Sequence, residues 1–144
     1  MAMMDTERVA YFMEELVPFN KFLGMKFTDV CSDSVTLMLP FKEEFVGDPG
    51  RRALHGGVIA SVLDVAGGTV CWASLNDVTA RVSTVDIRID YLRKGPCEDL
   101  LCTATILRTG NKVAVARMEL VAASNPTVLI ATGQAVYNVV RKLD

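Results

Sequence analysis

Hydrophobic residues at the start of the chain recur with the period of an α-helix. Within residues 6–19 they sit three or four positions apart, and either Asp5 or Thr6 is suited to cap such a helix. Pro18 is expected to end it, because proline disrupts a helix interior. The positions that carry this pattern are Val9, Phe12, Met13, Leu16 and Val17. The sequence therefore predicts an amphipathic N-terminal helix.

Two short runs follow at residues 25–30 and 34–39, separated by Ser32 and Asp33. Such runs around a polar pair predict a β-hairpin. Residues 41–54 contain Gly47, Pro49, Gly50 and charges of both signs, and we expect a loop there.

Residues 55–75 form a long apolar stretch, and its only charged residue is Asp64. A carboxylate at the centre of a membrane-spanning helix would cost roughly 2.5–3.5 kcal/mol. We therefore expect a helix buried inside the protein rather than in a membrane.

Polar and apolar residues alternate strictly in residues 84–91, where the polar positions begin at Thr84 and the apolar positions at Val85. This pattern predicts a strand with one wet and one dry face. Three further strands are expected at 100–107, 112–122 and 128–139, with turns at 95–96, 109–111 and 124–126. The predicted order is a helix, two strands, a long helix and a four-stranded meander. It indicates an α+β fold in which an antiparallel sheet wraps around a central helix, and residues 1–144 are expected to form a single domain.

Composition adds an expectation of self-association. Apolar residues make up 51% of the chain and mean hydropathy is +0.30, which is high for a small soluble monomer, so we expect subunit interfaces. The net charge of −2 without a basic cluster argues against nucleic acid as a partner. Four cysteines without a CxxC pair, and one histidine, do not predict a metal site. Free thiols and the lack of a signal-peptide pattern at the N-terminus are typical of a cytoplasmic protein.

Candidate chemistry is concentrated where the long helix begins. Gly56 and Gly57 follow His55, and the first amides of a helix have no partner within the helix and carry its positive dipole end. These glycines predict an oxyanion hole. Alternatively, they allow a tight turn, and His55 is simply a residue of the helix cap.

Asp64 is the second candidate, because aspartate is a poor helix former and its neighbours here are apolar. A buried carboxylate must have hydrogen-bond partners, face a polar cleft or hold its proton tightly. Asp64 is thus a candidate nucleophile or general base, and the alternative is a structural acid with satisfied partners.

The spacing between these two candidates favours a site shared by two subunits. Nine residues separate His55 from Asp64, which is about a half-turn from the starting direction and a rise of roughly 13–14 Å. One helix cannot easily aim its own first amides and Asp64 at one carbonyl. Two antiparallel helices related by a twofold axis could do so.

The segments LHGGVIASVLDVAGG and STVDIRIDYLRKGP resemble hotdog-fold acyl-CoA thioesterases of the PaaI-like type, within the 4-hydroxybenzoyl-CoA thioesterase superfamily. The resemblance covers about residues 20–140. It implies hydrolysis of an acyl-CoA to a free acid and CoA, without a metal or cofactor, in a dimer or a dimer of dimers. The acyl chain would run along the apolar helix face between subunits.

The resemblance also implies roles for individual residues. Asp64 would attack the thioester or activate water, the amides near Gly57 would polarise the carbonyl, and His55 would orient the thioester. Thr84 would place a hydroxyl near the attacking water. This chain departs from the family at Pro49, where many relatives carry an asparagine.

Two basic pairs are candidates to hold the CoA phosphates, namely Arg93 with Lys94 and Arg51 with Arg52. Solvated loop charge is the alternative for both pairs. Two other functions stay open: a non-catalytic acyl-CoA-binding module, and a hotdog hydratase or dehydratase, which typically needs a histidine beside the helix carboxylate.

Overall fold

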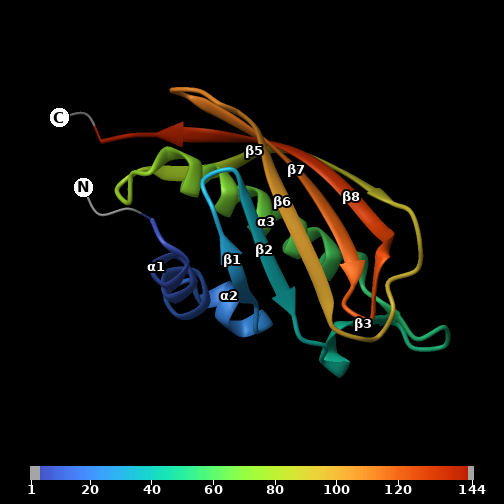
Figure 1. Cartoon of the computed structure of the whole chain (residues 1–144). Helices are drawn as coiled ribbons and strands as arrows, with labels where there is room; N and C mark the ends of the chain where they lie inside the picture. The colour runs from blue at the N-terminus through green and yellow to red at the C-terminus, as the bar shows by residue number, and fades with distance from the viewer. Residues whose placement is uncertain (1–3, 143–144) are drawn as a thin grey trace.

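The computed structural model describes residues 4–142, and its main feature is a six-stranded antiparallel sheet that wraps around one long helix (Figure 1). The strand order in this sheet is β1-β2-β6-β7-β8-β5. The long helix, α3, spans Gly56–Leu75 and packs against five of these strands. The α+β hotdog arrangement expected from the sequence is therefore confirmed. The strands are β1 (Lys26–Val30), β2 (Ser34–Leu39), β5 (Arg81–Tyr91), β6 (Leu100–Thr109), β7 (Val113–Ala122) and β8 (Asn125–Val140).

The N-terminal helical region is longer and more broken than the sequence indicated. It consists of α1 (Thr6–Tyr11), a π-helical turn η1 (Phe12–Leu16) and α2 (Pro18–Leu23). Of the two predicted cap residues it is Asp5 that caps α1, by accepting a hydrogen bond from the Arg8 amide. The first helical stretch ends just before Pro18, as predicted, since Val17 is extended. The sequence did not predict that a second helix begins there. Proline lacks an N–H, and at the first position of a helix that N–H has no partner to lose, so Pro18 can begin α2.

The predicted hairpin is confirmed, because β1 and β2 pair antiparallel. The prediction of a plain loop at residues 41–54 was wrong. This segment contains a 3₁₀ turn η2 (Glu43–Phe45) and two short strands, β3 (Val46–Asp48) and β4 (Ala53–Leu54), which form a separate two-stranded sheet. Glycine is required at position 47, since an added Cβ would lie 2.6 Å from the Cα of His55. This small sheet therefore holds the residue that precedes α3.

Helix α3 begins and ends where the sequence predicted, with His55 as its N-cap and Asn76, at a positive φ of 48°, as its C-cap. Among the described residues it is the one helix long and apolar enough to cross a membrane. Ten of its twenty residues are buried, and the sheet supplies the covering surface. Its apolar character is thus explained by packing within the protein.

Strand β5 differs from the prediction in its neighbour and in its faces. It pairs with β8 rather than β6, so only β6, β7 and β8 form a meander, and β5 lies at the edge of the sheet. A register shift between Thr84 and Asp86 leaves Val85 64% exposed. This extra residue reverses the alternation, so Thr84 lies on the helix-facing side and not on the polar face.

The three remaining strands are confirmed, with small extensions. Pro126 was expected in a turn but lies inside β8, and the turn is formed by residues 123–124. This end of β8 extends beyond its last pair with β5, Ala131 with Tyr91, so the missing N–H of Pro126 breaks no ladder on that side. All four cysteines are free thiols, as predicted.

Candidate active site

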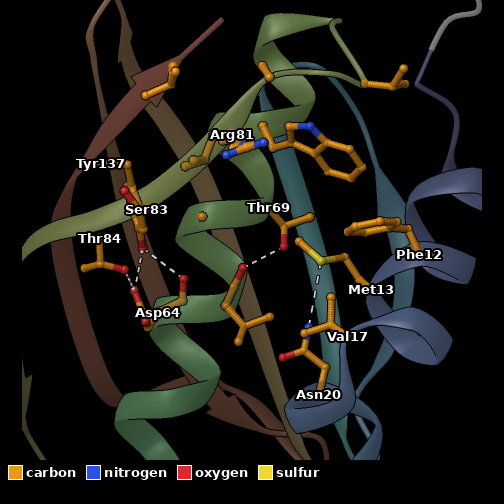
Figure 2. A pocket seen from close by; sticks show the side chains of 17 residues that line it. Phe12, Met13, Val17, Asn20, Asp64, Thr69, Arg81, Ser83, Thr84 and Tyr137 are labelled. Carbon is orange, nitrogen blue, oxygen red and sulfur yellow. Dashed lines mark hydrogen bonds between the residues drawn. The ribbon is translucent and has the colours of Figure 1, made fainter. Parts of the chain in front are cut away.

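Two hydroxyl groups converge on the carboxylate of Asp64 (Figure 2). Thr84 on β5 donates a hydrogen bond to Oδ1 at 2.7 Å, and the Tyr137 hydroxyl on β8 lies 3.2 Å from the same oxygen. Tyr137 also donates to the backbone carbonyl of Asp64 at 2.9 Å. The carboxylate is therefore oriented by two different strands, and it has the partners that its apolar helix cannot supply.

Tyr137 was not identified from the sequence as a site residue. Burial raises its pKa, and the negative charge of Asp64 raises it further, so the phenol stays protonated and acts as a donor. Gly67 makes room for this contact, since an added Cβ would collide with the Tyr137 hydroxyl and lie 2.9 Å from Met118 Sδ. The sequence signal that could have indicated this contact is Gly67, a glycine inside α3 about one turn after Asp64, because it points to a close neighbour there.

Asp64 faces a cleft of about 640 Å³ between α3, the start of β5 and the N-terminal helices. In Figure 2, Phe12, Met13 and Val17 lie across the cleft from Asp64 and Thr84. The sequence did not predict that the N-terminal helix contributes to the site. Most of the walls are apolar, and they include Phe12, Met13, Val17, Val65, Trp72 and Val82.

The start of α3 does not line this cleft. Its first amides were expected to be unpaired, but one of them has a partner. The Gly57 N–H donates to Nδ1 of His55 at 2.8 Å, so His55 is the N-cap residue. Because Nδ1 accepts this bond, the proton of a neutral ring sits on Nε2. Tyr91 donates to the Gly56 carbonyl at 3.0 Å. The Gly57 amide can therefore bind a substrate oxygen only by giving up His55.

In each basic pair, one arginine already binds another part of the protein. Arg52 forms a two-pronged ion pair with Glu43, at 2.8 Å for each hydrogen bond. Arg93 donates to the Leu129 carbonyl at 2.6 Å. Neither guanidinium is therefore directed at the start of α3 in this structure.

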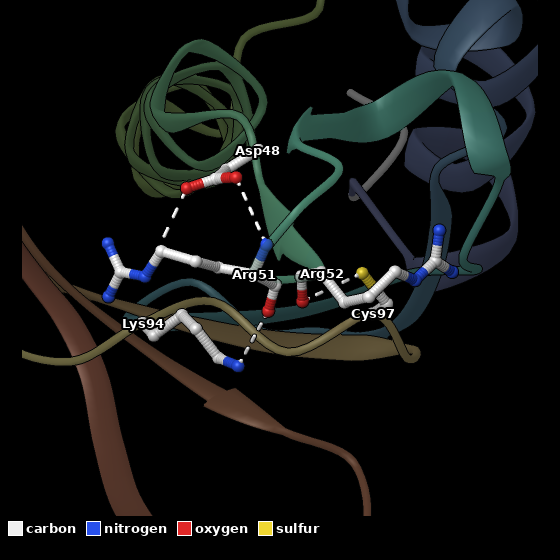
Figure 3. Close-up of polar contacts among 5 residues, drawn as sticks. All are labelled: Asp48, Arg51, Arg52, Lys94 and Cys97. Atoms are coloured by element: carbon white, nitrogen blue, oxygen red, sulfur yellow. Dashed lines mark hydrogen bonds and ion pairs between the residues drawn. The ribbon is translucent and has the colours of Figure 1, made fainter.

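The other two members, Arg51 and Lys94, lie together (Figure 3). Lys94 Nζ donates to the Arg51 carbonyl at 3.0 Å, and Asp48 accepts from the Arg51 amide at 3.1 Å, which orders the loop around Pro49. Leu54, two residues before α3 begins, donates to the carbonyl of Gly95, the residue after Lys94, at 3.0 Å. This basic cluster therefore lies beside the start of α3.

The predicted site residues thus fall into two groups at different points along α3. One group contains Asp64 and Thr84, joined by Tyr137. The other lies at the start of the helix and contains His55, Gly56, Gly57, Arg51 and Lys94. Within residues 4–142, no cluster of three or more histidine, cysteine or acidic side chains could hold a metal ion.

Removing the Tyr137 hydroxyl should lower turnover without weakening substrate binding. A hydrogen bond to a charged group contributes roughly 1.5–3 kcal/mol, so we expect Tyr137→Phe to lower kcat by about 10–100-fold. Thr84→Val, which removes the other donor, should act in the same direction. Steady-state kinetics on both variants checks this, and a rise in KM at unchanged kcat would contradict the orienting role.

Comparisons with known proteins identify the family and the fold of this chain. The family model described as "Thioesterase superfamily" matches residues 52–129. The chain is 40% identical over 135 residues to the medium/long-chain acyl-CoA thioesterase YigI of Escherichia coli K12, covering 85% of this chain and 86% of that protein. The YigI protein of Salmonella typhimurium is 38% identical over the same share.

Solved structures give the same result. A Shewanella oneidensis protein related to the thioesterase superfamily superposes with a TM-score of 0.83 at 35% identity, covering 92% of this chain and 94% of that one. Zebrafish thioesterase superfamily member 2 has a TM-score of 0.80 at 23% identity and covers 94% of this chain and 98% of its own, which supports the fold alone.

Proposed function

Because this chain belongs to the thioesterase superfamily, we propose that it hydrolyses acyl-CoA thioesters to a free carboxylic acid and CoA. The observation that carries this proposal is the carboxylate of Asp64, held by two hydroxyl donors at the side of an apolar cleft. The name of the YigI relative and the apolar walls of the cleft both favour a medium or long acyl chain.

In the proposed mechanism, Asp64 either takes a proton from water or attacks the thioester carbon itself. Thr84 and Tyr137 both bind Oδ1, so we assign the proton transfer or the attack to Oδ2. If Asp64 is the base, the hydroxyl of water bonds to the acyl carbon as the carbon–sulfur bond breaks, and the proton of water ends on the CoA sulfur. If Asp64 is the nucleophile, its oxygen bonds to the acyl carbon as the CoA thiolate leaves, and water then cleaves the acyl-aspartyl anhydride and supplies the proton for the thiolate. Developing charge on the carbonyl oxygen would be stabilised by the first amides of α3 at Gly56 and Gly57. The Gly57 N–H would exchange His55 Nδ1 for this oxygen, and Nε2 of His55 would be available as a further donor.

These two groups of residues would meet across a dimer. Helical rise places Asp64 roughly 13 Å beyond the start of its own α3, which is too far for one carbonyl. Strand β5 is an edge strand of eleven residues with apolar side chains exposed, Val85 by 64% and Tyr91 by 53%. Exposed edges of this kind pair with other strands. Pairing of β5 with its copy would place two α3 helices antiparallel, and Asp64 would then face the first amides of the partner's helix. A dimer of two such dimers is compatible with the high apolar content.

Arg51 and Lys94 are the residues we propose for the CoA phosphates, since they lie together beside the start of α3. To bind phosphate, Arg51 would leave its 4.0 Å ion pair with Asp48, and Lys94 would leave the Arg51 carbonyl. Arg52 and Arg93 would likewise have to leave Glu43 and Leu129. We propose a cytoplasmic location, which suits four cysteines that are all free thiols.

The proposed reaction is tested by mixing the purified protein with acyl-CoAs of increasing chain length and measuring CoA release and acid by mass spectrometry. We expect turnover with medium or long chains. Binding without thiol release would favour the acyl-CoA-binding module. Water addition to an enoyl-CoA without thiol release would favour the hydratase.

A further inference from the structure

Two apolar cavities lie next to each other, and three residues form the boundary between them. The first is the cleft of about 640 Å³ that contains Asp64. The second, of about 250 Å³, lies between α1, η1 and α3. Phe12, Trp72 and Val78 line both cavities, so these side chains separate the two spaces.

The main part of this wall is a pair of aromatic rings. The rings of Phe12 and Trp72 lie 5.2 Å apart between centroids and are tilted by 44°, an arrangement in which aromatic pairs attract each other. Trp72 comes from α3, and Phe12 opens the π-helical turn η1, where the Val17 amide donates to the Phe12 carbonyl at 3.2 Å. Single π-turns of this kind often occur at functional sites.

The helix fixes the distance between Asp64 and the aromatic wall. Trp72 follows Asp64 by eight residues on the same helix, which is about 12 Å along the axis. Most of the side chains that line the cavity are apolar, with Asn20, Arg81 and Ser83 as polar exceptions, and the Thr69 hydroxyl already donates to the Val65 carbonyl at 2.6 Å. A hydrocarbon chain loses no hydrogen bonds in such a space, whereas the two amides of the CoA pantetheine arm would.

On the premise of the proposed thioesterase function, we propose that the Phe12–Trp72 pair closes the acyl cavity opposite Asp64 and sets the longest acyl chain that the enzyme accepts. With the thioester carbonyl held at Asp64, the chain lies between α3 and the N-terminal helices of the same protomer, rather than between subunits as the family resemblance implied. Its last carbon reaches the aromatic pair at the preferred length, and longer chains collide with it.

Truncation of either ring should shift the chain-length preference toward longer substrates. Trp72→Ala joins the 640 Å³ and 250 Å³ spaces, so carbons excluded in the wild type gain a buried environment. Two added methylenes should then raise kcat/KM of the longer chain relative to the wild-type optimum by about tenfold. Phe12→Ala removes the exposed half of the same wall and should shift the preference in the same direction.

The experiment compares kcat/KM over a series of straight-chain acyl-CoAs for wild type, Trp72→Ala and Phe12→Ala. The matched control is Phe22→Ala, which removes a phenyl ring that is 73% exposed on α2 and lines neither cavity. We expect a longer optimum in the two wall variants and an unchanged optimum in the control. Equal changes at all chain lengths would overturn the proposal, because that result indicates a pantetheine site or a general structural effect.

A second measurement does not depend on catalysis or on a variant. Trp72 is the only tryptophan of the chain, so its fluorescence reports on the wall directly. Titration of the wild type with non-hydrolysable thioether analogues should change the emission only above a threshold length. An emission change independent of length, or none where calorimetry records binding, would overturn the proposal. A length threshold without turnover of any acyl-CoA would overturn the proposed function and leave the wall in place.

Discussion

Replacing Asp64 with asparagine should abolish thioester hydrolysis while leaving acyl-CoA binding almost intact. The amide keeps the shape of the side chain and can still accept hydrogen bonds from Thr84 and Tyr137 at its oxygen. It can neither take a proton from water nor act as a nucleophile. General-base catalysis contributes roughly 10²–10⁴-fold, so we expect kcat to fall by about that factor or more.

The measurement is CoA release, with calorimetric titration of a non-hydrolysable thioether analogue to follow binding. Asp33→Asn is the matched control, since Asp33 is an exposed acid in the turn between β1 and β2, and it should keep wild-type turnover. Turnover of Asp64→Asn at the wild-type rate would remove Asp64 from the mechanism. Loss of binding in this variant would assign Asp64 to substrate binding instead.

A single turnover in ¹⁸O-labelled water, with enzyme in excess, tests for direct attack by Asp64, because label on the protein requires an acyl-aspartyl intermediate. If Asp64 activates water, the labelled oxygen appears in the acid in the first turnover. If Asp64 attacks the thioester, an acyl-aspartyl anhydride forms, and attack of water on the aspartyl carbon leaves the label on the protein.

Adding negative charge along β5 should both separate the subunits and abolish activity in the same variant. We expect this from Val85→Glu combined with Arg88→Glu, which would place glutamates beside Asp86 and Asp90 on an edge strand. In a twofold pairing of β5 with its copy, these acids would repel each other. Each protomer keeps Asp64 but loses the partner's helix start, so kcat/KM should fall by about 10²-fold or more.

Sedimentation velocity and CoA release, measured on the same samples, test this expectation. The matched control is Val113→Glu, which adds a charge at an apolar residue 42% exposed on β7, inside the sheet order rather than at its edge. A stable monomer with full activity would contradict the shared site. A dimer that persists without activity would mean that β5 serves the chemistry but not the assembly.

Much of the fold followed from local patterns in the sequence. The apolar run of α3, the alternation in the strands and the Asp5 cap depend on neighbouring residues, so their prediction needed no tertiary information. Pro18 marks the end of the first helical stretch as predicted, but the second helix was missed, because proline suits both a break between helices and the first position of a new one. The bulge at Val85 arises from the pairing of β5 with β8. The alternation of polar and apolar residues within β5 does not reveal that pairing.

By itself, the sequence determined the family, the central helix and the two chemically unusual positions on it, Asp64 and the glycines after His55. Only the tertiary structure decided what surrounds them. Tyr137 reaches Asp64 from 73 residues further along the chain, and the N-terminal helices close the cleft beside it. The physical reason is that hydrogen-bond partners and cavity walls are set by which distant segments pack together, and no local period carries that information.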